Sequence, residues 1–146
     1  MTRMLLLALA TASTPAVASS KINVLTFNVW GVSPLISKYR KTRIKAICKI
    51  FQEQSQNQNG WDVVFLQELW NRKNREALKN CGYPYSADLD TTNNDSGLLI
   101  LSRLPVVASS RLIFYRQGLY KPIFNDCERL AKKSILLASI IHPMLG

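Results

Sequence analysis

The fold of this chain is decided by two stretches, Ile22-Asn23-Val24-Leu25-Thr26-Phe27-Asn28 and Trp61-Asp62-Val63-Val64-Phe65-Leu66-Gln67-Glu68. Both are rich in β-branched and aromatic residues and end on a polar residue, which is typical of short strands. Between them, apolar residues recur at helical spacing, and they are Ile44, Ile47, Cys48 and Phe51. This pattern predicts a helix from near Ser37 to the polar loop at 54–60. Because a helix joins the two strands, we expect the strands to lie parallel in one sheet.

Asn28 and Glu68 are the candidate metal ligands. Each follows an apolar run directly, and the carboxyl ends of parallel strands meet at one edge of a sheet. An amide oxygen and a carboxylate are hard donors of the kind that Mg²⁺ accepts. Considered alone, Asn28 could as well cap a turn and Glu68 could be a solvated strand end.

The two residues belong to a longer series of motifs in one order. The series is Leu25-Thr26-Phe27-Asn28-Val29-Trp30-Gly31, Leu66-Gln67-Glu68-Leu69-Trp70, Gly82-Tyr83-Pro84-Tyr85-Ser86 and Ser96-Gly97-Leu98-Leu99-Ile100-Leu101-Ser102-Arg103-Leu104-Pro105-Val106. It resembles the endonuclease/exonuclease/phosphatase superfamily, and within it the neutral, Mg²⁺-dependent sphingomyelinase-like phosphodiesterases. The resemblance extends from about Lys21 to Ile141.

The resemblance implies an α/β fold of the four-layer α+β sandwich type. This chain would form the first half, with helices on the outer face of a sheet. It further implies hydrolysis of sphingophospholipid head groups with Mg²⁺, or alternatively Mn²⁺, bound by Asn28 and Glu68. Two protein ligands suffice when phosphate and water complete the octahedron, so we expect millimolar affinity.

Three later motifs of the family do not occur in the sequence: Asn-Thr-His-Leu, Gly-Asp-x-Asn and the terminal Ser-Asp-His. The single histidine, His142, precedes Pro143. We therefore expect a domain at 19–146 that is truncated before the catalytic histidine strand. Such a chain contains no catalytic residue of its own and should be inactive.

Two other functions remain open. A non-catalytic module could dock its basic face on anionic lipid or nucleic acid, since six Lys and Arg crowd the first predicted helix and the chain carries a net charge of +10. A solvated outer helix face explains the same charges. A nuclease of the same superfamily is less favoured, because Leu69-Trp70 and Tyr83-Pro84-Tyr85 resemble the lipid branch.

Residues 1–18 have the layout of a secretory signal peptide. Arg3 precedes the apolar run 4–10, and Ala16-Val17-Ala18 is a cleavage motif, so the mature chain should begin at Ser19 and be secreted or periplasmic. Export permits a disulfide, for which Cys81 and Cys127 are the candidates, whereas Cys48 is expected to be a buried thiol. No Cys-x-x-Cys pair is present, which disfavours zinc.

Further elements are predicted as a helix at 72–79 and strands at 97–102, 106–115 and 134–141. The segment 118–127 reads as a loop, and Tyr120 and Phe124 in it are candidate membrane or substrate contacts. Without the second sheet of the sandwich, apolar side chains lose part of their cover on alternate strand faces, so we expect self-association through the uncovered sheet. The residues expected to lose cover are Val24, Phe27, Val64, Leu66, Leu99 and Leu101.

Overall fold

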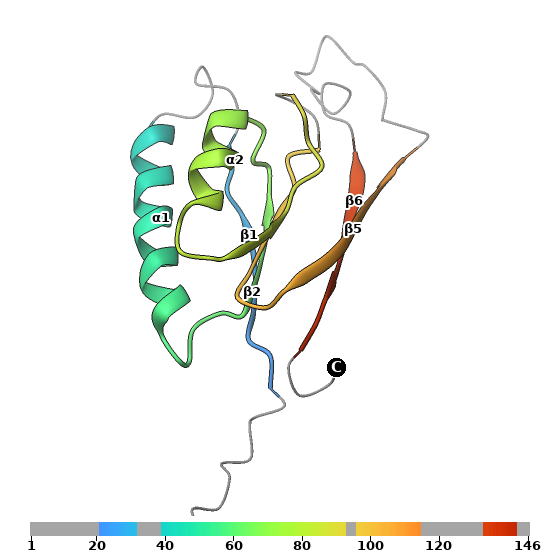
Figure 1. Cartoon of the computed structure of the whole chain (residues 1–146). Helices are drawn as coiled ribbons and strands as arrows, with labels where there is room; N and C mark the ends of the chain where they lie inside the picture. The colour runs from blue at the N-terminus through green and yellow to red at the C-terminus, as the bar shows by residue number, and fades with distance from the viewer. Residues whose placement is uncertain (1–20, 32–38, 93–95, 115–132, 143–146) are drawn as a thin grey trace, which may run out of the picture.

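A computed structural model describes residues 21–31, 39–92, 96–114 and 133–142. In chain order the elements are β1 (Val24–Asn28), α1 (Arg40–Gln56), β2 (Val63–Gln67), α2 (Arg72–Lys79), β3 (Tyr85–Ala87), β4 (Leu99–Ser102), β5 (Val106–Ile113) and β6 (Ser134–Ile140). They form layers, with both helices on one face of a sheet and the β5–β6 hairpin on its other face (Figure 1). Neither helix in the described ranges is long and apolar enough to cross a membrane.

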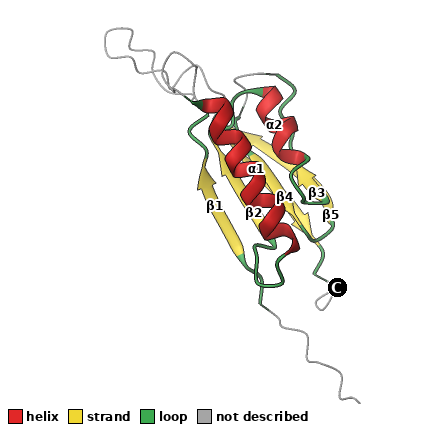
Figure 2. Cartoon of the chain, turned by 90° about the vertical axis from the view of Figure 1, so that its left-hand side faces the viewer, coloured by secondary structure: helices red, strands yellow, loops and turns green. Residues whose placement is uncertain are grey.

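The central sheet has the order β1-β2-β4-β3 within the described residues. β1 and β2 are parallel neighbours, with Val24 opposite Val63 and Asn28 opposite Gln67. α1 connects the two strands and covers one face of the sheet (Figure 2), which confirms the predicted strand–helix–strand unit. β4 pairs antiparallel with both β2 and β3. The sequence patterns did not predict β3, because it is three residues long and follows Pro84.

The main core lies between the helices and the central sheet. Ile44, Ile47 and Phe51 project from α1, as their spacing predicts. They pack with Val64, Leu66, Leu99 and Leu101 of the strands. The expectation that these four strand residues lose their cover was wrong, because they face the helices and are buried. Val24 and Phe27 of the edge strand β1 are exposed, in agreement with the expectation.

A smaller apolar cluster joins the central sheet to the hairpin. Val63, Ala87 and Ile100 are buried there against one side of β6. The opposite side of the hairpin carries a row of exposed apolar side chains, which includes Leu112, Ile135 and Leu137. β6 alternates along its length between these two faces. The hairpin therefore presents an apolar surface to solvent.

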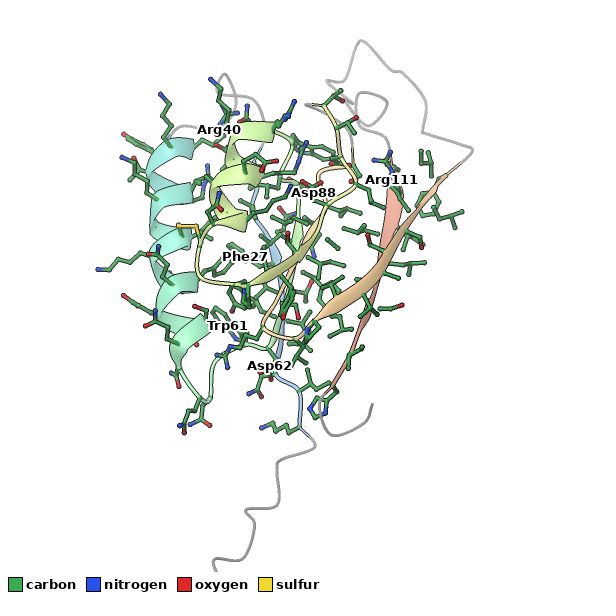
Figure 3. The ribbon with its side chains drawn as sticks, in the orientation of Figure 1. Phe27, Arg40, Trp61, Asp62, Asp88 and Arg111 are labelled. Atoms are coloured by element: carbon green, nitrogen blue, oxygen red, sulfur yellow. A yellow bond between two sulfur atoms is a disulfide. The ribbon has the colours of Figure 1, made fainter. Side chains whose placement is uncertain are left out.

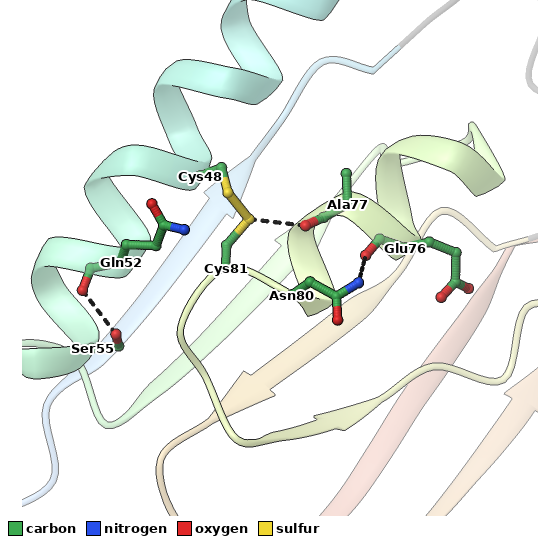
Figure 4. Close-up of a disulfide and its surroundings, with 7 residues drawn as sticks. All are labelled: Cys48, Gln52, Ser55, Glu76, Ala77, Asn80 and Cys81. Carbon is green, nitrogen blue, oxygen red and sulfur yellow. Dashed lines mark hydrogen bonds between the residues drawn. A yellow bond between two sulfur atoms is a disulfide. The ribbon is translucent and has the colours of Figure 1, made fainter.

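A disulfide joins Cys48 of α1 to Cys81, which follows α2 (Figure 4). Their Cα atoms lie 5.1 Å apart, although 33 positions separate them in sequence. The two helices pack side by side on one face of the sheet, and this packing brings the cysteines together. The candidate Cys81–Cys127 pair was wrong, since Cys81 is bonded to Cys48, and so was the expected thiol at Cys48. Cys127 itself lies outside the described residues.

Candidate metal centre

Asn28 and Glu68 lie at the same edge of the central sheet, as the strand pattern predicts. Asn28 is the last residue of β1, and Glu68 follows Gln67, the last residue of β2. Two backbone hydrogen bonds continue the pairing past the strand ends. The Val29 N–H donates to the Gln67 carbonyl over 2.9 Å, and the Gly31 N–H donates to the Glu68 carbonyl over 2.8 Å. The backbones that carry the two side chains are thus joined directly.

Glu68 has a left-handed backbone conformation, with φ at +57°. A non-glycine residue in this region costs roughly 1–3 kcal/mol and persists where its surroundings hold it, often at functional sites. Gly31 is one of those surroundings, since a Cβ at this position would collide with the Glu68 carbonyl oxygen. The glycine in the motif that ends at Gly31 is therefore required by the close approach of the two backbones.

The Asn28 side chain caps the turn that follows β1. Its Oδ1 accepts a hydrogen bond of 2.8 Å from the Trp30 N–H. An amide oxygen has two lone pairs, so this bond fixes the side chain and still leaves one lone pair for a cation. The turn-capping interpretation and the metal interpretation of Asn28 are compatible for this reason.

The donor set fits a hard divalent cation. Asn28 contributes a neutral oxygen and Glu68 a charged one, and both residues retain solvent exposure that admits water. In the part of the chain that the structure describes, no group of three or more His, Cys, Asp or Glu is placed to hold a metal ion. Mg²⁺ and Mn²⁺ tolerate so few protein ligands, because water and substrate phosphate can fill the other positions. A zinc site would need nitrogen or sulfur ligands instead.

His142 is placed far from this edge by the strand register. Val63 at the start of β2 pairs with Ser102 at the end of β4, and Val106 pairs with Ile140 at the end of β6. His142 follows β6 and so lies toward the start of β2, whereas Glu68 follows its end. The imidazole is therefore at the opposite edge of the sheet from Asn28 and Glu68.

A cluster of charged side chains that the sequence patterns did not predict lies near the candidate metal ligands. We call it the buried ionic cluster: Arg75 and Lys79 of α2, Asp88 and Asp90 after β3, and Arg111 of β5. Although partial burial alone would lower the pKa of Lys79, hydrogen bonds to Asp88 and Glu76 raise it above its ordinary value. The signal for this cluster in the sequence is the Asp-x-Asp pattern directly after Ala87.

Several predicted features fall outside the described residues. Tyr120 and Phe124 belong to the segment 115–132, and the signal sequence belongs to 1–20. Their proposed roles in membrane contact and export therefore remain predictions.

The fold is an α/β arrangement of two sheets, with the candidate ligands Asn28 and Glu68 at the carboxyl ends of neighbouring parallel strands. The chain belongs to the Endonuclease/Exonuclease/phosphatase family, whose profile matches residues 25–138. This match confirms the predicted superfamily.

Similar proteins confirm the sphingomyelinase-like resemblance. A candidate neutral sphingomyelinase of Drosophila melanogaster is 35% identical over 92 residues, which are 61% of this chain and 20% of that protein. An inositol phosphosphingolipids phospholipase C of Schizosaccharomyces pombe is 28% identical over 126 residues, or 84% and 28% of the two chains. The crystal structure of sphingomyelinase C from Streptomyces griseocarneus matches with a TM-score of 0.53 at 19% identity, covering 83% of this chain and 44% of that one. The chain thus spans 20–28% of these two curated relatives.

Proposed function

We propose that this chain supplies the metal-binding part of an exported, sphingomyelinase-like phosphodiesterase. The observation that carries the proposal is the convergence of Asn28 and Glu68 on one sheet edge, in a chain whose family match covers both residues. The similarity to proteins named for sphingolipid substrates supports a phospholipid phosphodiester as the substrate. Secretion or a periplasmic location is part of the proposal and rests on the signal-like residues 1–18.

Glu68 and Asn28 would have different roles in binding the ion. Glu68 brings the negative charge that attracts a divalent cation, and the Asn28 amide adds an oxygen without further charge. A bound Mg²⁺ would polarise a phosphoryl oxygen of the substrate and neutralise developing negative charge. The hydrogen bond from the Trp30 N–H fixes the Asn28 amide oxygen, and the left-handed backbone at Glu68 sets the direction in which that side chain leaves the strand end.

We further propose that the 146-residue chain does not hydrolyse phosphodiesters by itself. Its one histidine lies at the opposite edge of the sheet and cannot activate water at Glu68. General-base assistance is typically worth about 10²–10⁴-fold in rate. Residues 19–146 would therefore form a partial catalytic domain that binds the ion without completing the reaction.

The experiment combines metal binding with activity. We expect the wild-type chain to bind Mn²⁺ at millimolar concentrations and Glu68→Gln to bind it much more weakly. Water-proton relaxation measures this binding. Glu53→Gln on the exposed side of α1 removes the same charge away from the strand ends and should leave Mn²⁺ binding unchanged. Equal affinity in wild type and Glu68→Gln would show that the site lies elsewhere. Sphingomyelin hydrolysis that disappears in Glu68→Ala would refute the proposed inactivity.

A second candidate function is docking on an anionic lipid surface. The guanidinium of Arg43 lies 5.3 Å from the centroid of the exposed Trp30 ring, and Arg40 and Lys41 lie at the same end of α1. An exposed aromatic ring beside basic side chains suits the interface of an acidic membrane. Vesicles with and without phosphatidylserine test this candidate, since binding should require the acidic lipid and weaken in Trp30→Ala.

A further inference from the structure

Arg75 lies at the centre of the buried ionic cluster, and its side chain is fully shielded from solvent. Its Nε atom is 3.5 Å from Asp88 Oδ2, and its Nη1 atom is 3.7 Å from Asp90 Oδ2. Asp88 and Arg111 are both found toward the end of the molecule where α2 begins, which is the upper end in Figure 3. β1 and β2 also end there. The cluster thus lies toward the same end of the molecule as Asn28 and Glu68.

The same guanidinium binds the backbone that follows Glu68. Nη1 donates to the Leu69 carbonyl over 3.2 Å and to the Trp70 carbonyl over 3.1 Å. Nη2 donates to the Thr92 carbonyl over 2.6 Å. One side chain therefore connects the turn after β2 with the segment that leads into β4.

The Glu68 turn is held from two further sides. The Glu68 carbonyl accepts from the Gly31 N–H, and the Leu69 N–H donates to the Gly97 carbonyl over 2.8 Å. Together with Arg75, these bonds fix the peptide groups that follow the Glu68 Cα. The backbone of Glu68 sets the direction of its side chain. Its φ of +57° is an unfavourable conformation that would relax without these hydrogen bonds, and the side chain would then change direction.

Asp90 links the Arg75 guanidinium to Gly97, whose carbonyl accepts the hydrogen bond from the Leu69 N–H. Its carboxylate accepts from the Ser96 and Gly97 N–H groups over 3.0 and 2.8 Å, and from the Ser96 hydroxyl over 2.6 Å. Arg111 donates to the same carboxylate over 2.8 Å. Gly97 in turn abuts the Trp70 ring, where an added Cβ would lie 2.7 Å from a ring carbon. The cluster therefore positions the very carbonyl that binds Leu69.

We propose that Arg75 is a positioning residue for the metal site, which acts through the backbone of residues 68–70 and thereby aims the Glu68 carboxylate. The inference rests on the proposed function and deepens it. A planar guanidinium can satisfy carbonyls and carboxylates on several sides at once, whereas an ammonium group offers a single point of charge. Outer residues that orient a metal ligand typically contribute about 10–100-fold to metal affinity.

A merely structural role would make any cation of the cluster equivalent. Lys79 provides the matched control, since its ammonium bonds two carboxylates, Asp88 over 2.8 Å and Glu76 over 3.1 Å, whereas Arg75 also bonds the backbone after Glu68. Arg75→Lys keeps the charge and most of the volume, and Lys79→Gln removes a cation. Asp90→Asn keeps the shape of the carboxylate and weakens its bonds to Gly97, so it serves as a second variant.

The first measurement is Mn²⁺ affinity of the 146-residue chain by water-proton relaxation. We expect Arg75→Lys to weaken binding about 10–100-fold, Asp90→Asn to weaken it in the same direction, and Lys79→Gln to leave it unchanged. Equal weakening in Arg75→Lys and Lys79→Gln would overturn the inference. So would unchanged affinity in Arg75→Lys alongside a loss in Glu68→Gln.

The second measurement is amide hydrogen exchange at Gly31 and Leu69, whose N–H groups bracket the Glu68 turn. Both amides should exchange faster in Arg75→Lys and at the wild-type rate in Lys79→Gln. If wild type shows no Glu68-dependent Mn²⁺ binding, the proposed metal function fails and the positioning of the metal ligand fails with it. Slow exchange that persists at both amides in Arg75→Lys refutes the positioning alone, whatever the metal does.

Discussion

Removing the Cys48–Cys81 disulfide should lower the free energy of unfolding, by an amount that depends on the number of residues between the two cysteines. The bridge closes a loop of 33 positions between α1 and the residue after α2. On the chain-entropy relation, a loop of this length restricts the unfolded chain by about 3.7 kcal/mol at 25 °C. Global stabilities of small domains are about 5–15 kcal/mol, so the loss would be a large share of the total.

Urea unfolding of wild type and of Cys48→Ala/Cys81→Ala measures this loss. With a slope of about 2 kcal/mol/M, the midpoint should fall by about 2 M. Dithiothreitol should lower the midpoint of wild type and should leave the double variant unchanged. Cys127→Ser is the control and should retain the stability of the oxidised wild-type chain.

Peptide mapping under non-reducing conditions checks the pairing itself. We expect Cys48 and Cys81 in one linked pair of peptides and Cys127 in neither. The same midpoint in oxidised wild type and the double variant would refute the proposed constraint. A Cys81–Cys127 peptide would refute the packing of α1 against α2 on which the constraint depends.

Two further outcomes follow from the described residues. Burial raises the pKa of Tyr83 above 10.0, and the pKa of Lys79 is raised above 10.5 by Asp88 and Glu76 despite partial burial. Above about pH 10 the unfolded chain then binds fewer protons than the native chain, so the free energy of unfolding should fall as pH rises. Urea melts across this range should show a shallower fall in Tyr83→Phe/Lys79→Met, and an equal fall would contradict the assignment. We also expect the exposed apolar side of the β5–β6 hairpin to cause self-association, which Leu112→Lys/Leu137→Lys should reduce in sedimentation velocity while Gln52→Lys on α1 does not. A wild-type chain that sediments as a monomer would contradict this proposal.

Local patterns predicted much of the secondary structure. The apolar spacing of α1 and the apolar runs of β1, β2 and β6 are strong signals, because periodicity reflects which side of each element is buried. The start of α1 was placed about three residues early, at Ser37 instead of Arg40. The missed strand β3 is held by pairing with β4, and such pairing leaves little trace in a three-residue sequence.

The sequence by itself determined that β1 and β2 are parallel and that Asn28 and Glu68 share one sheet edge, because a helical crossover between adjacent strands permits little else. Only the tertiary structure decided which strand face meets the helices. Alternation separates two faces but does not say what covers each one. The prediction that Val64 and Leu66 lose part of their cover was therefore wrong, and both are buried. The partner of Cys81 and the role of Arg75 depend in the same way on packing between elements distant in sequence. A buried arginine and a solvated one have the same side chain, and only the surrounding carbonyls and carboxylates distinguish them.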